Sequence, residues 1–278
     1  MFDYHIHPDF SSDAQGSIAD YCQQARSIGL KEICFTTHYE PDPMRSDIEY
    51  VQVNGKRMAM DSDWVEYYFQ EIERARQAFP ELVVLQGVEV GYEMGLEGKI
   101  ADFLAKNRFD YVLGAIHCLD HIAITASAEL ADFRKRLKPR GAEYIAHRYF
   151  DYVRAAAGSG LFDCLAHLDI WRKYLKSELG IKFEQAIKPL IPVMVQVVAC
   201  SGVGLEINCA ALRRGEAEPY PGLEIITQAV AAGVKTFTIG SDAHRVNDLG
   251  AGCEKAVILL KRFGLSPNQF RNRQPLIE

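Results

Sequence analysis

Phe2-Asp3-Tyr4-His5-Ile6-His7 is a short, mostly apolar stretch that carries two histidines on alternate positions. Successive side chains of a β-strand point to opposite faces, so His5 and His7 are expected to point to the same side and to approach one metal ion together. Pro8 ends the stretch, and Asp13 follows His7 by six residues. The stretch therefore predicts a strand that carries half of a metal site.

Six further short apolar stretches follow, with longer amphipathic stretches between them. The predicted strands cover residues 2–7, 31–37, 82–90, 110–116, 162–167, 203–208 and 235–240. The predicted helices cover residues 17–28, 62–79, 97–107, 142–157, 183–200, 222–232 and 250–263. Strands that alternate with helices are typical of a parallel α/β structure. The alternation runs through all 278 residues without a break in composition, so we expect a single domain over residues 1–278.

Residues 41–61 form the one long segment without periodicity, and they include Pro41, Pro43 and Gly55. Loops of this length are usually functional or mobile. We expect a lid or a substrate-specificity loop here, with a plain surface excursion as the alternative.

The composition argues against several classes of protein. Hydrophobic residues make up 48% of the chain and charged residues 24%, as in ordinary globular proteins. We find no apolar run of about eighteen residues that would cross a bilayer, and the formal charge of −6 gives no overall basic field for nucleic acid. The seven cysteines are scattered and odd in number, so we expect reduced thiols and a cytoplasmic protein without a membrane or nucleic-acid partner.

Side chains that bind metals stand at the end of every predicted strand. In chain order they are His5 and His7, His38, Glu89, His117, His167 with Asp169, Glu206 with Asn208, and Asp242 with His244. The C-terminal ends of the strands of a parallel barrel converge on one face, where enzymes of this architecture carry their chemistry. Any one of these histidines alone fits a hydrogen-bonded core residue better, but the set as a whole indicates metal ligands. His121 enters a loop and His147 lies in a predicted helix, so we leave both out of the site.

These residues carry a resemblance to the polymerase and histidinol phosphatase (PHP) superfamily. The matching motifs are His5-Ile6-His7 with Asp13, Thr37-His38, Gly87-Val88-Glu89, Gly114-Ala115-Ile116-His117, Ala166-His167-Leu168-Asp169 and Gly240-Ser241-Asp242-Ala243-His244. Softer motifs are most similar to the histidinol-phosphate phosphatase branch: residues 167–174, Glu206-Ile207-Asn208 with Leu212-Arg213-Arg214, Pro219-Tyr220-Pro221, and Leu249-Gly250. The resemblance implies an α/β fold, a distorted seven-stranded TIM-like (β/α) barrel of the PHP type.

The resemblance also implies a cluster of three divalent metal ions. One ion would be held by His5, His7, Glu89 and Asp242, a second by Glu89, His117 and His167, and the third by Asp13, His38 and His244. Many relatives have a histidine where this chain has Asp13, which would make the third site more anionic. Mixed imidazole and carboxylate ligands suit zinc, iron or manganese, and no organic cofactor is expected.

The implied reaction is the hydrolysis of a small phosphomonoester by a hydroxide that bridges the metal ions. Within this branch the substrate would be L-histidinol phosphate, converted to L-histidinol and phosphate in histidine biosynthesis. Asp242 and His244 are candidate catalytic residues, and neither is assigned as the general acid.

Other candidates would contact the substrate. Arg172 is the first candidate for a phosphate clamp, because a guanidinium grips two phosphoryl oxygens, and a solvated charge at a helix start is its alternative. Arg148 and Arg213 are weaker candidates. Glu206 and Asn208 would either bind the amino group and imidazole of histidinol phosphate or support the metal ligands.

Three alternatives stay open. A PHP enzyme that acts on nucleotides or oligonucleotides would share every ligand. An amidohydrolase also begins with a His-x-His motif, but that family usually has a lysine at the end of the fourth strand, where this chain has Ile116-His117. A non-catalytic metal-binding module is the third alternative, and the complete ligand set argues against it.

Overall fold

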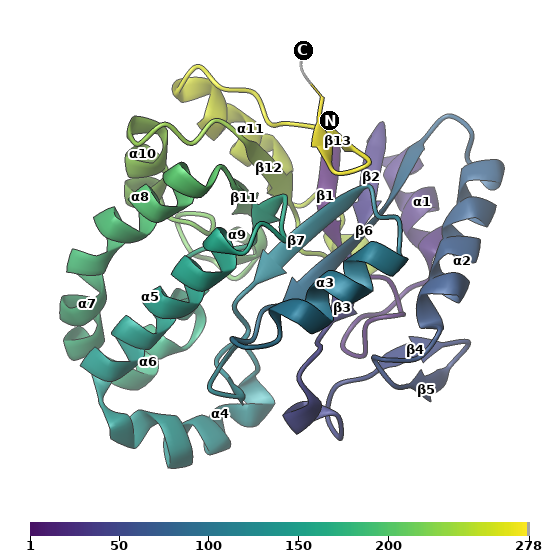
Figure 1. Cartoon of the computed structure of the whole chain (residues 1–278). Helices are drawn as coiled ribbons and strands as arrows, with labels where there is room; N and C mark the ends of the chain where they lie inside the picture. Colours follow the sequence, from purple (N-terminus) through teal and green to yellow (C-terminus); the bar gives the residue numbers. More distant parts are fainter. Residues whose placement is uncertain (277–278) are drawn as a thin grey trace.

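The computed structural model describes residues 1–276, and its centre is one parallel sheet (Figure 1). The strands, in sheet order, are β1 (Phe2–Ile6), β2 (Glu32–Phe35), β6 (Val83–Gly91), β7 (Tyr111–Ala115), β10 (Cys164–Leu165), β11 (Gly204–Asn208) and β12 (Phe237–Gly240). The first and last strands meet at their C-terminal ends, where the His7 N–H donates to the Ala243 carbonyl over 2.9 Å. The seven predicted strands are confirmed, and they form a nearly closed, distorted (β/α) barrel.

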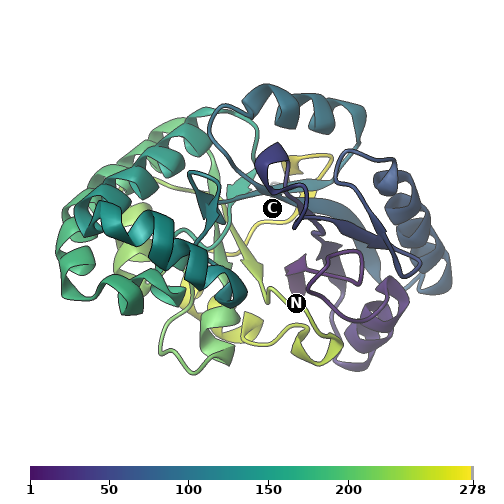
Figure 2. The same ribbon diagram turned by 90° about the horizontal axis from the view of Figure 1, so that it is seen from below.

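Helices surround the strands, as the view from below shows (Figure 2). The longer ones are α1 (Ile18–Ser27), α2 (Trp64–Ala78), α3 (Glu97–Lys106), α5 (Ala142–Gly158), α8 (Ile191–Ser201), α10 (Leu223–Ala231) and α11 (Cys253–Arg262). The shorter ones include α4 (Leu130–Asp132), α6 (Leu175–Leu179), α7 (Ile181–Ile187) and α9 (Ala210–Arg213). The first helix begins where predicted, because Ser17 and Asp20 form a reciprocal capping box.

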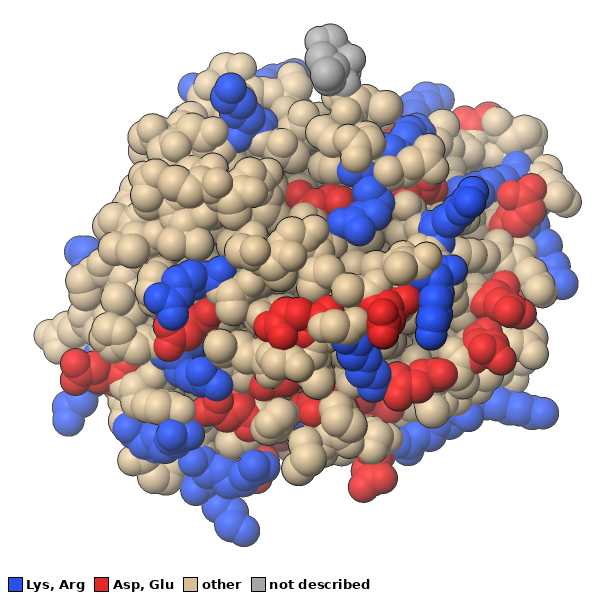
Figure 3. Space-filling view, viewed as in Figure 1, with Lys and Arg blue, Asp and Glu red and all other residues tan. Residues whose placement is uncertain are grey.

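The predicted helix over residues 183–200 is divided into α7, a 3₁₀ turn at Lys188–Leu190, and α8. The helical segment Ile181–Ser201 is 21 residues long and contains an 18-residue window with a mean hydropathy of 1.3, which by length and composition alone is enough to cross a membrane. Lys182, Glu184 and Lys188 interrupt the segment, so it is apolar on average but is not an unbroken apolar run. Phe183, Met194 and Val198 of this segment are buried in the hydrophobic core, so it belongs to the outer helical layer of the barrel. In Figure 3 the surface over α8 and α10 is largely uncharged, whereas charges of both signs are interspersed elsewhere.

Aromatic side chains fill the inside of the barrel at its N-terminal end. The rings of Tyr4 on β1 and Tyr111 on β7 lie 5.3 Å apart, although these strands are not neighbours in the sheet. Phe270 packs 5.0 Å from the Tyr111 ring and belongs to the hairpin of β13 (Phe270–Arg271) and β14 (Gln274–Pro275). This hairpin closes the same end, near the N-terminus (Figure 1). The hydroxyl groups of these tyrosines are satisfied at the same end, where Tyr4 donates to Glu32 and the Tyr111 hydroxyl lies 2.7 Å from Thr238 Oγ1.

The segment 41–61 has more regular structure than predicted. It contains a 3₁₀ turn at Pro43–Arg45 and a hairpin of β4 (Val51–Val53) and β5 (Lys56–Met58). Asn54 and Gly55 turn the hairpin with φ of 52° and 72°, a conformation typical of an Asn-Gly turn. Val51 and Val53 are buried, so the segment is packed onto the barrel.

Candidate metal centre

His5 and His7 lie on the same side of β1, as their alternation predicts. Both imidazoles are fully buried, and their Nε2 atoms are 2.9 Å apart. Two ring nitrogens at this distance share at most one proton between them, whereas a cation beside them would accept both lone pairs.

Glu89, at the end of β6, lies at the centre of the histidines. Its carboxylate oxygens are within 3.4 Å of ring nitrogens from five imidazoles. These imidazoles belong to His5, His7, His38, His117 and His167. Four separate strand ends supply them, so the convergence depends on the barrel and not on any local motif.

Asp242, His244 and Asp13 complete the group on the opposite side. Asp242 Oδ1 lies 3.6 Å from both His5 Nε2 and His7 Nε2 and 3.4 Å from His244 Nδ1. His244 Nε2 lies 3.3 Å from Asp13 Oδ2, and Asp13 is the most exposed member of the group. The structure thus brings all nine predicted ligands to one end of the barrel. Asp242 and His167 adopt positive φ of 56° and 28°, which non-glycine residues adopt mainly at functional sites.

The unpaired atoms of this group fit divalent cations. Glu89 Oε2 and His38 Nδ1 are buried 3.0 Å apart, but they do not face each other in the geometry of a hydrogen bond, and neither has another hydrogen-bond partner among the described residues. His167 Nδ1 is also buried without a partner. Buried polar atoms are nearly always satisfied, so unpaired nitrogen and carboxylate oxygen atoms pointing at one another indicate bound positive charge. Around Glu89, four groups place their ligand atoms within 4.8 Å of one another: His5, His7 and Glu89; Glu89, His117 and His167; His7, His38 and His244; and His38, Glu40 and His117.

The pKa shifts in the group have the same origin. Burial alone would lower the pKa of His5, but the carboxylates of Glu206, Glu89 and Asp242 outweigh it and raise that pKa well above its usual value. The pKa of Glu89 is held well below its usual range, because the surrounding imidazoles outweigh its burial. The buried carboxylates and imidazoles around Glu89 therefore bind positive charge strongly.

Carboxylates behind the histidines fix the orientation of their rings. Glu206 Oε1 lies 2.6 Å from His5 Nδ1, so the Nδ1–H donates to the carboxylate and Nε2 faces the site. Asn208 Nδ2 donates to Glu206 over 3.1 Å and to Asp242 over 3.2 Å. Neither Glu206 nor Asn208 lines the cavity; both lie behind the histidines, in contact with His5 and Asp242.

Glu40 has the same role for His117 and was missed in the sequence. Its Oε1 lies 2.6 Å from His117 Nδ1. Gly91 makes room for it, since a Cβ at that position would overlap the Glu40 carboxylate. The available signal was its position two residues after His38, on the same face of an extended segment.

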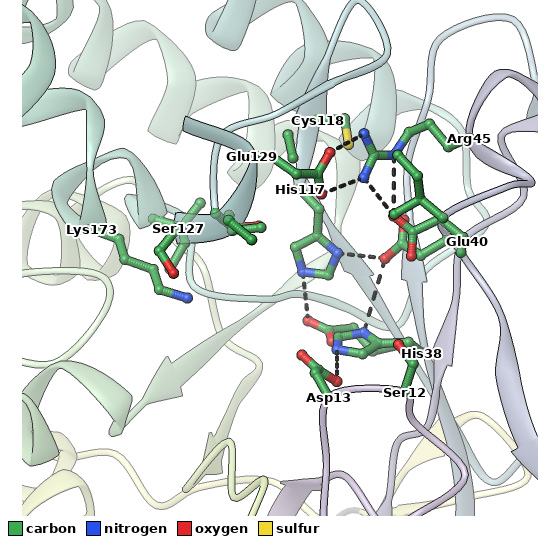
Figure 4. A pocket seen from close by; sticks show the side chains of 18 of the residues that line it. Ser12, Asp13, His38, Glu40, Arg45, His117, Cys118, Ser127, Glu129 and Lys173 are labelled. Atoms are coloured by element: carbon green, nitrogen blue, oxygen red, sulfur yellow. Dashed lines mark hydrogen bonds and ion pairs between the residues drawn. The ribbon is translucent and has the colours of Figure 1, made fainter. Parts of the chain in front are cut away.

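A cavity of about 410 Å³ opens over the group (Figure 4). The 41–61 segment contributes Arg45, Ile48, Glu49 and Met60 to its wall. Arg45 is nearly buried and pairs with Glu49 over 2.6 Å and with Glu129 over 2.9 Å. The ammonium group of Lys173 points into the cavity and forms no ion pair with any residue from 1 to 276.

None of the three arginines predicted to clamp phosphate lines this cavity. Arg172 donates to Asp169 over 3.0 Å and to Glu216 over 2.6 Å, beside a different cavity. Arg148 pairs with Asp120, and Arg213 donates to the Asp242 carbonyl over 2.9 Å. Arg172 and Lys173 lie on one 3₁₀ turn, Ile170–Lys173, in which successive side chains point about 120° apart, so only one of the two faces the site.

Comparisons with known proteins agree with this arrangement. Residues 3–210 match the model of the PHP domain. The probable histidinol-phosphatase of Deinococcus radiodurans is 31% identical over 275 residues, which cover 99% of this chain and 98% of that protein. The probable histidinol-phosphatase of Thermotoga maritima is 27% identical, over 95% of this chain and 92% of that protein. The crystal structure of histidinol phosphate phosphatase from Lactococcus lactis, complexed with zinc, L-histidinol and phosphate, superposes with a TM-score of 0.79 at 22% identity, over 99% of this chain and 98% of that one. The chain therefore belongs to the PHP domain family.

Proposed function

We propose that this chain is a metal-dependent phosphomonoesterase that hydrolyses L-histidinol phosphate to L-histidinol and phosphate. The observation that carries the proposal is the set of five imidazoles around Glu89, at the base of a cavity that also holds the unpaired Lys173. Full-length relatives named as histidinol-phosphatases support the choice of substrate. So does the similar Lactococcus lactis structure, which holds both products of that reaction.

We further propose three divalent ions, of zinc, iron or manganese, held by the nine ligands in the sets given above. When bound, such ions would supply positive charge for the phosphoryl oxygens and lower the pKa of a water molecule between them. The protein's own contribution is orientation, because Glu206 and Glu40 lock the rings of His5 and His117 with Nε2 toward the site. Burial of the His5 ring also excludes bulk water from the base of the cavity.

Lys173 is the residue that we assign to the substrate phosphate. Its free ammonium faces the cavity, whereas the charge of Arg45 is neutralised by two carboxylates. A compact ammonium attracts a phosphate dianion without needing a fixed planar geometry. Glu40, Glu49 and Glu129 also line the cavity and give a cationic ammonium or imidazolium of the substrate acidic partners.

We propose that residues 1–278 act as one domain in which residues 41–61 form the specificity loop. This loop supplies Arg45 and Glu49 to the cavity wall and so contacts the end of the substrate away from the phosphate. We place the enzyme in the cytoplasm, consistent with seven cysteines that are all free thiols.

The proposal is tested by measuring phosphate release by the purified, zinc-loaded protein from L-histidinol phosphate and from a panel of nucleoside mono- and bisphosphates. We expect kcat/KM to be highest for L-histidinol phosphate and to be abolished in Glu89→Gln. A higher kcat/KM for a nucleotide would contradict the choice of substrate and favour a nucleotide phosphatase.

A further inference from the structure

A second group of possible ligands lies beside the metal centre and is used by none of the roles above. It consists of Asp42, Glu93 and His121. Each member follows a proposed ligand by four residues along the same segment. The pairs are His38 and Asp42, Glu89 and Glu93, and His117 and His121. The three segments that meet at Glu89 therefore meet a second time, further along the chain.

The sheet explains why the segments meet again. The two-residue strand β3 (His38–Tyr39) pairs with β6, and β6 pairs with β7, all in parallel. Along an extended chain, every second side chain points to the same face. Residues that are neighbours on two paired chains are therefore followed by further neighbours two and four residues along each chain. Glu40 and Gly91 lie between the two groups of ligands, and the glycine leaves space for the Glu40 carboxylate. His121 joins the second group from the turn of the hairpin formed by β8 (Cys118–Leu119) and β9 (Ile122–Ala123), where its φ is 66°.

The three side chains converge closely. His121 Nδ1 lies 2.8 Å from Asp42 Oδ2 and 3.8 Å from Glu93 Oε1, and all three ligand atoms lie within 4.8 Å of one another. Ligand atoms of one zinc ion stand about 2.0–2.2 Å from the metal, so separations of this size fit a common ion. The His121 side chain is 42% exposed, which leaves a path for an ion and for a water ligand.

Glu93 is the observation that points to a ligand. The residue is only 4% exposed, and its Oε2 has no hydrogen-bond partner among the described residues. Its Oε1 accepts from the Tyr152 hydroxyl, which itself accepts from the Asp120 N–H over 2.8 Å. No lysine or arginine within residues 1–276 forms an ion pair with Glu93 or Asp42. Asp42 Oδ1 accepts from the Met44 N–H over 2.9 Å, and Asp42 Oδ2 lies 2.8 Å from His121 Nδ1, so Glu93 Oε2 is the one carboxylate oxygen of the group without a partner among the described residues. A buried carboxylate oxygen without a partner is costly unless a cation is bound beside it.

We propose that Asp42, Glu93 and His121 bind a further divalent cation of the zinc type, separate from the centre at Glu89. Two carboxylates and one neutral imidazole give a site of zero net charge with a divalent ion. The ion fastens the start of the 41–61 loop to the end of β6 and to the β8–β9 hairpin. Arg45 Nη1 donates to the His121 carbonyl over 3.3 Å, so the same junction also positions Arg45 at the cavity wall.

The test is a count of zinc ions per chain. Wild type, His121→Ala and Glu93→Gln are each saturated with zinc, freed of loosely bound metal by gel filtration, and analysed by inductively coupled plasma mass spectrometry. We expect each variant to bind one zinc fewer than wild type. Glu93→Gln keeps the size of the side chain and an oxygen for Tyr152, and the exposed His147→Ala on α5 is the control for unspecific histidine binding. Equal zinc content in wild type, His121→Ala and Glu93→Gln would overturn the proposal.

Limited trypsin digestion gives a second readout. Lys56 and Arg57 are exposed cleavage sites in the 41–61 hairpin. We expect zinc to slow cleavage there at least several-fold in wild type and in His147→Ala but not in His121→Ala. Equal protection by zinc in His121→Ala would contradict the role in fastening the loop. Both readouts are independent of substrate, so a chain that failed to hydrolyse L-histidinol phosphate would still show the loss of one zinc.

Discussion

Glu206→Gln tests whether the carboxylates behind the histidines prepare the metal centre. Glu206 and His5 are both buried, and their hydrogen bond of 2.6 Å joins a carboxylate to the Nδ1–H of the ring. A hydrogen bond to a charged group contributes about 1.5–3 kcal/mol, and loss of a residue that orients a metal ligand usually costs 10–100-fold in affinity. The two estimates agree, because 10–100-fold corresponds to about 1.4–2.7 kcal/mol. We therefore expect zinc affinity to fall by about one to two orders of magnitude in Glu206→Gln.

The assay is a competition for zinc against a chromophoric chelator, with circular dichroism to verify folding. Glu224→Gln on the exposed face of α10 removes the same charge far from the histidines and serves as the matched control. If Glu206→Gln and Glu224→Gln bind zinc within twofold of wild type, the carboxylate does not prepare His5 and the reasoning is refuted.

Three further perturbations follow from the same contacts. Lys173→Ala should raise KM for L-histidinol phosphate about 10- to 100-fold, because one charge-assisted contact contributes about 1.5–3 kcal/mol, and Lys173→Arg should partly restore it. An unchanged KM in steady-state assays would show that Lys173 does not bind the substrate phosphate. Gly91→Ala should displace Glu40 from His117 and lower zinc affinity in chelator competition about tenfold, and unchanged affinity would show that this carboxylate is not needed. Hydrogen bonds from Arg134 lower the pKa of Glu178 to about 2, so the pair stabilises the fold above pH 4.5 and this stabilisation is lost as the pH falls toward 2. Glu178→Gln should therefore lower the free energy of unfolding by about 0.5–1 kcal/mol at pH 7 and by less near pH 3 in urea titrations, and an equal loss at both values would contradict this.

Strand periodicity predicted a parallel α/β structure with seven strands, and the resemblance to PHP proteins implied that these strands form a barrel. A residue such as Glu89 ends a buried apolar run, and a parallel barrel brings all such ends to one face. The nine predicted ligands therefore meet in the structure, although segments as distant as His5 and His244 supply them. The short strands could not be predicted in the same way. The strands β4, β5, β8 and β9 have two or three residues each, too few for an alternating pattern to be recognised.

The substrate-facing residues could not be predicted from the sequence because side-chain direction in irregular segments depends on distant partners. Arg172 and Lys173 are adjacent, and the arginine turns away from the cavity because Asp169, Glu216 and two backbone carbonyl groups of the 218–219 segment accept its hydrogen bonds. Glu216 lies more than forty residues beyond Arg172 and has no local signal that relates the two. The sequence likewise gives no local signal that Arg45 of the 41–61 segment forms an ion pair with Glu129, which lies more than eighty residues further along the chain.

The central claim is that the metal centre around Glu89 hydrolyses L-histidinol phosphate, and one measurement tests it most directly. Phosphate release from L-histidinol phosphate is followed with the protein stripped of metal by a chelator and then with zinc, iron(II) or manganese(II) added back. We predict no turnover by the stripped wild type, recovery with at least one of the ions, and no recovery in Glu89→Gln. Full activity of the stripped protein, or full recovery in Glu89→Gln, would contradict the account.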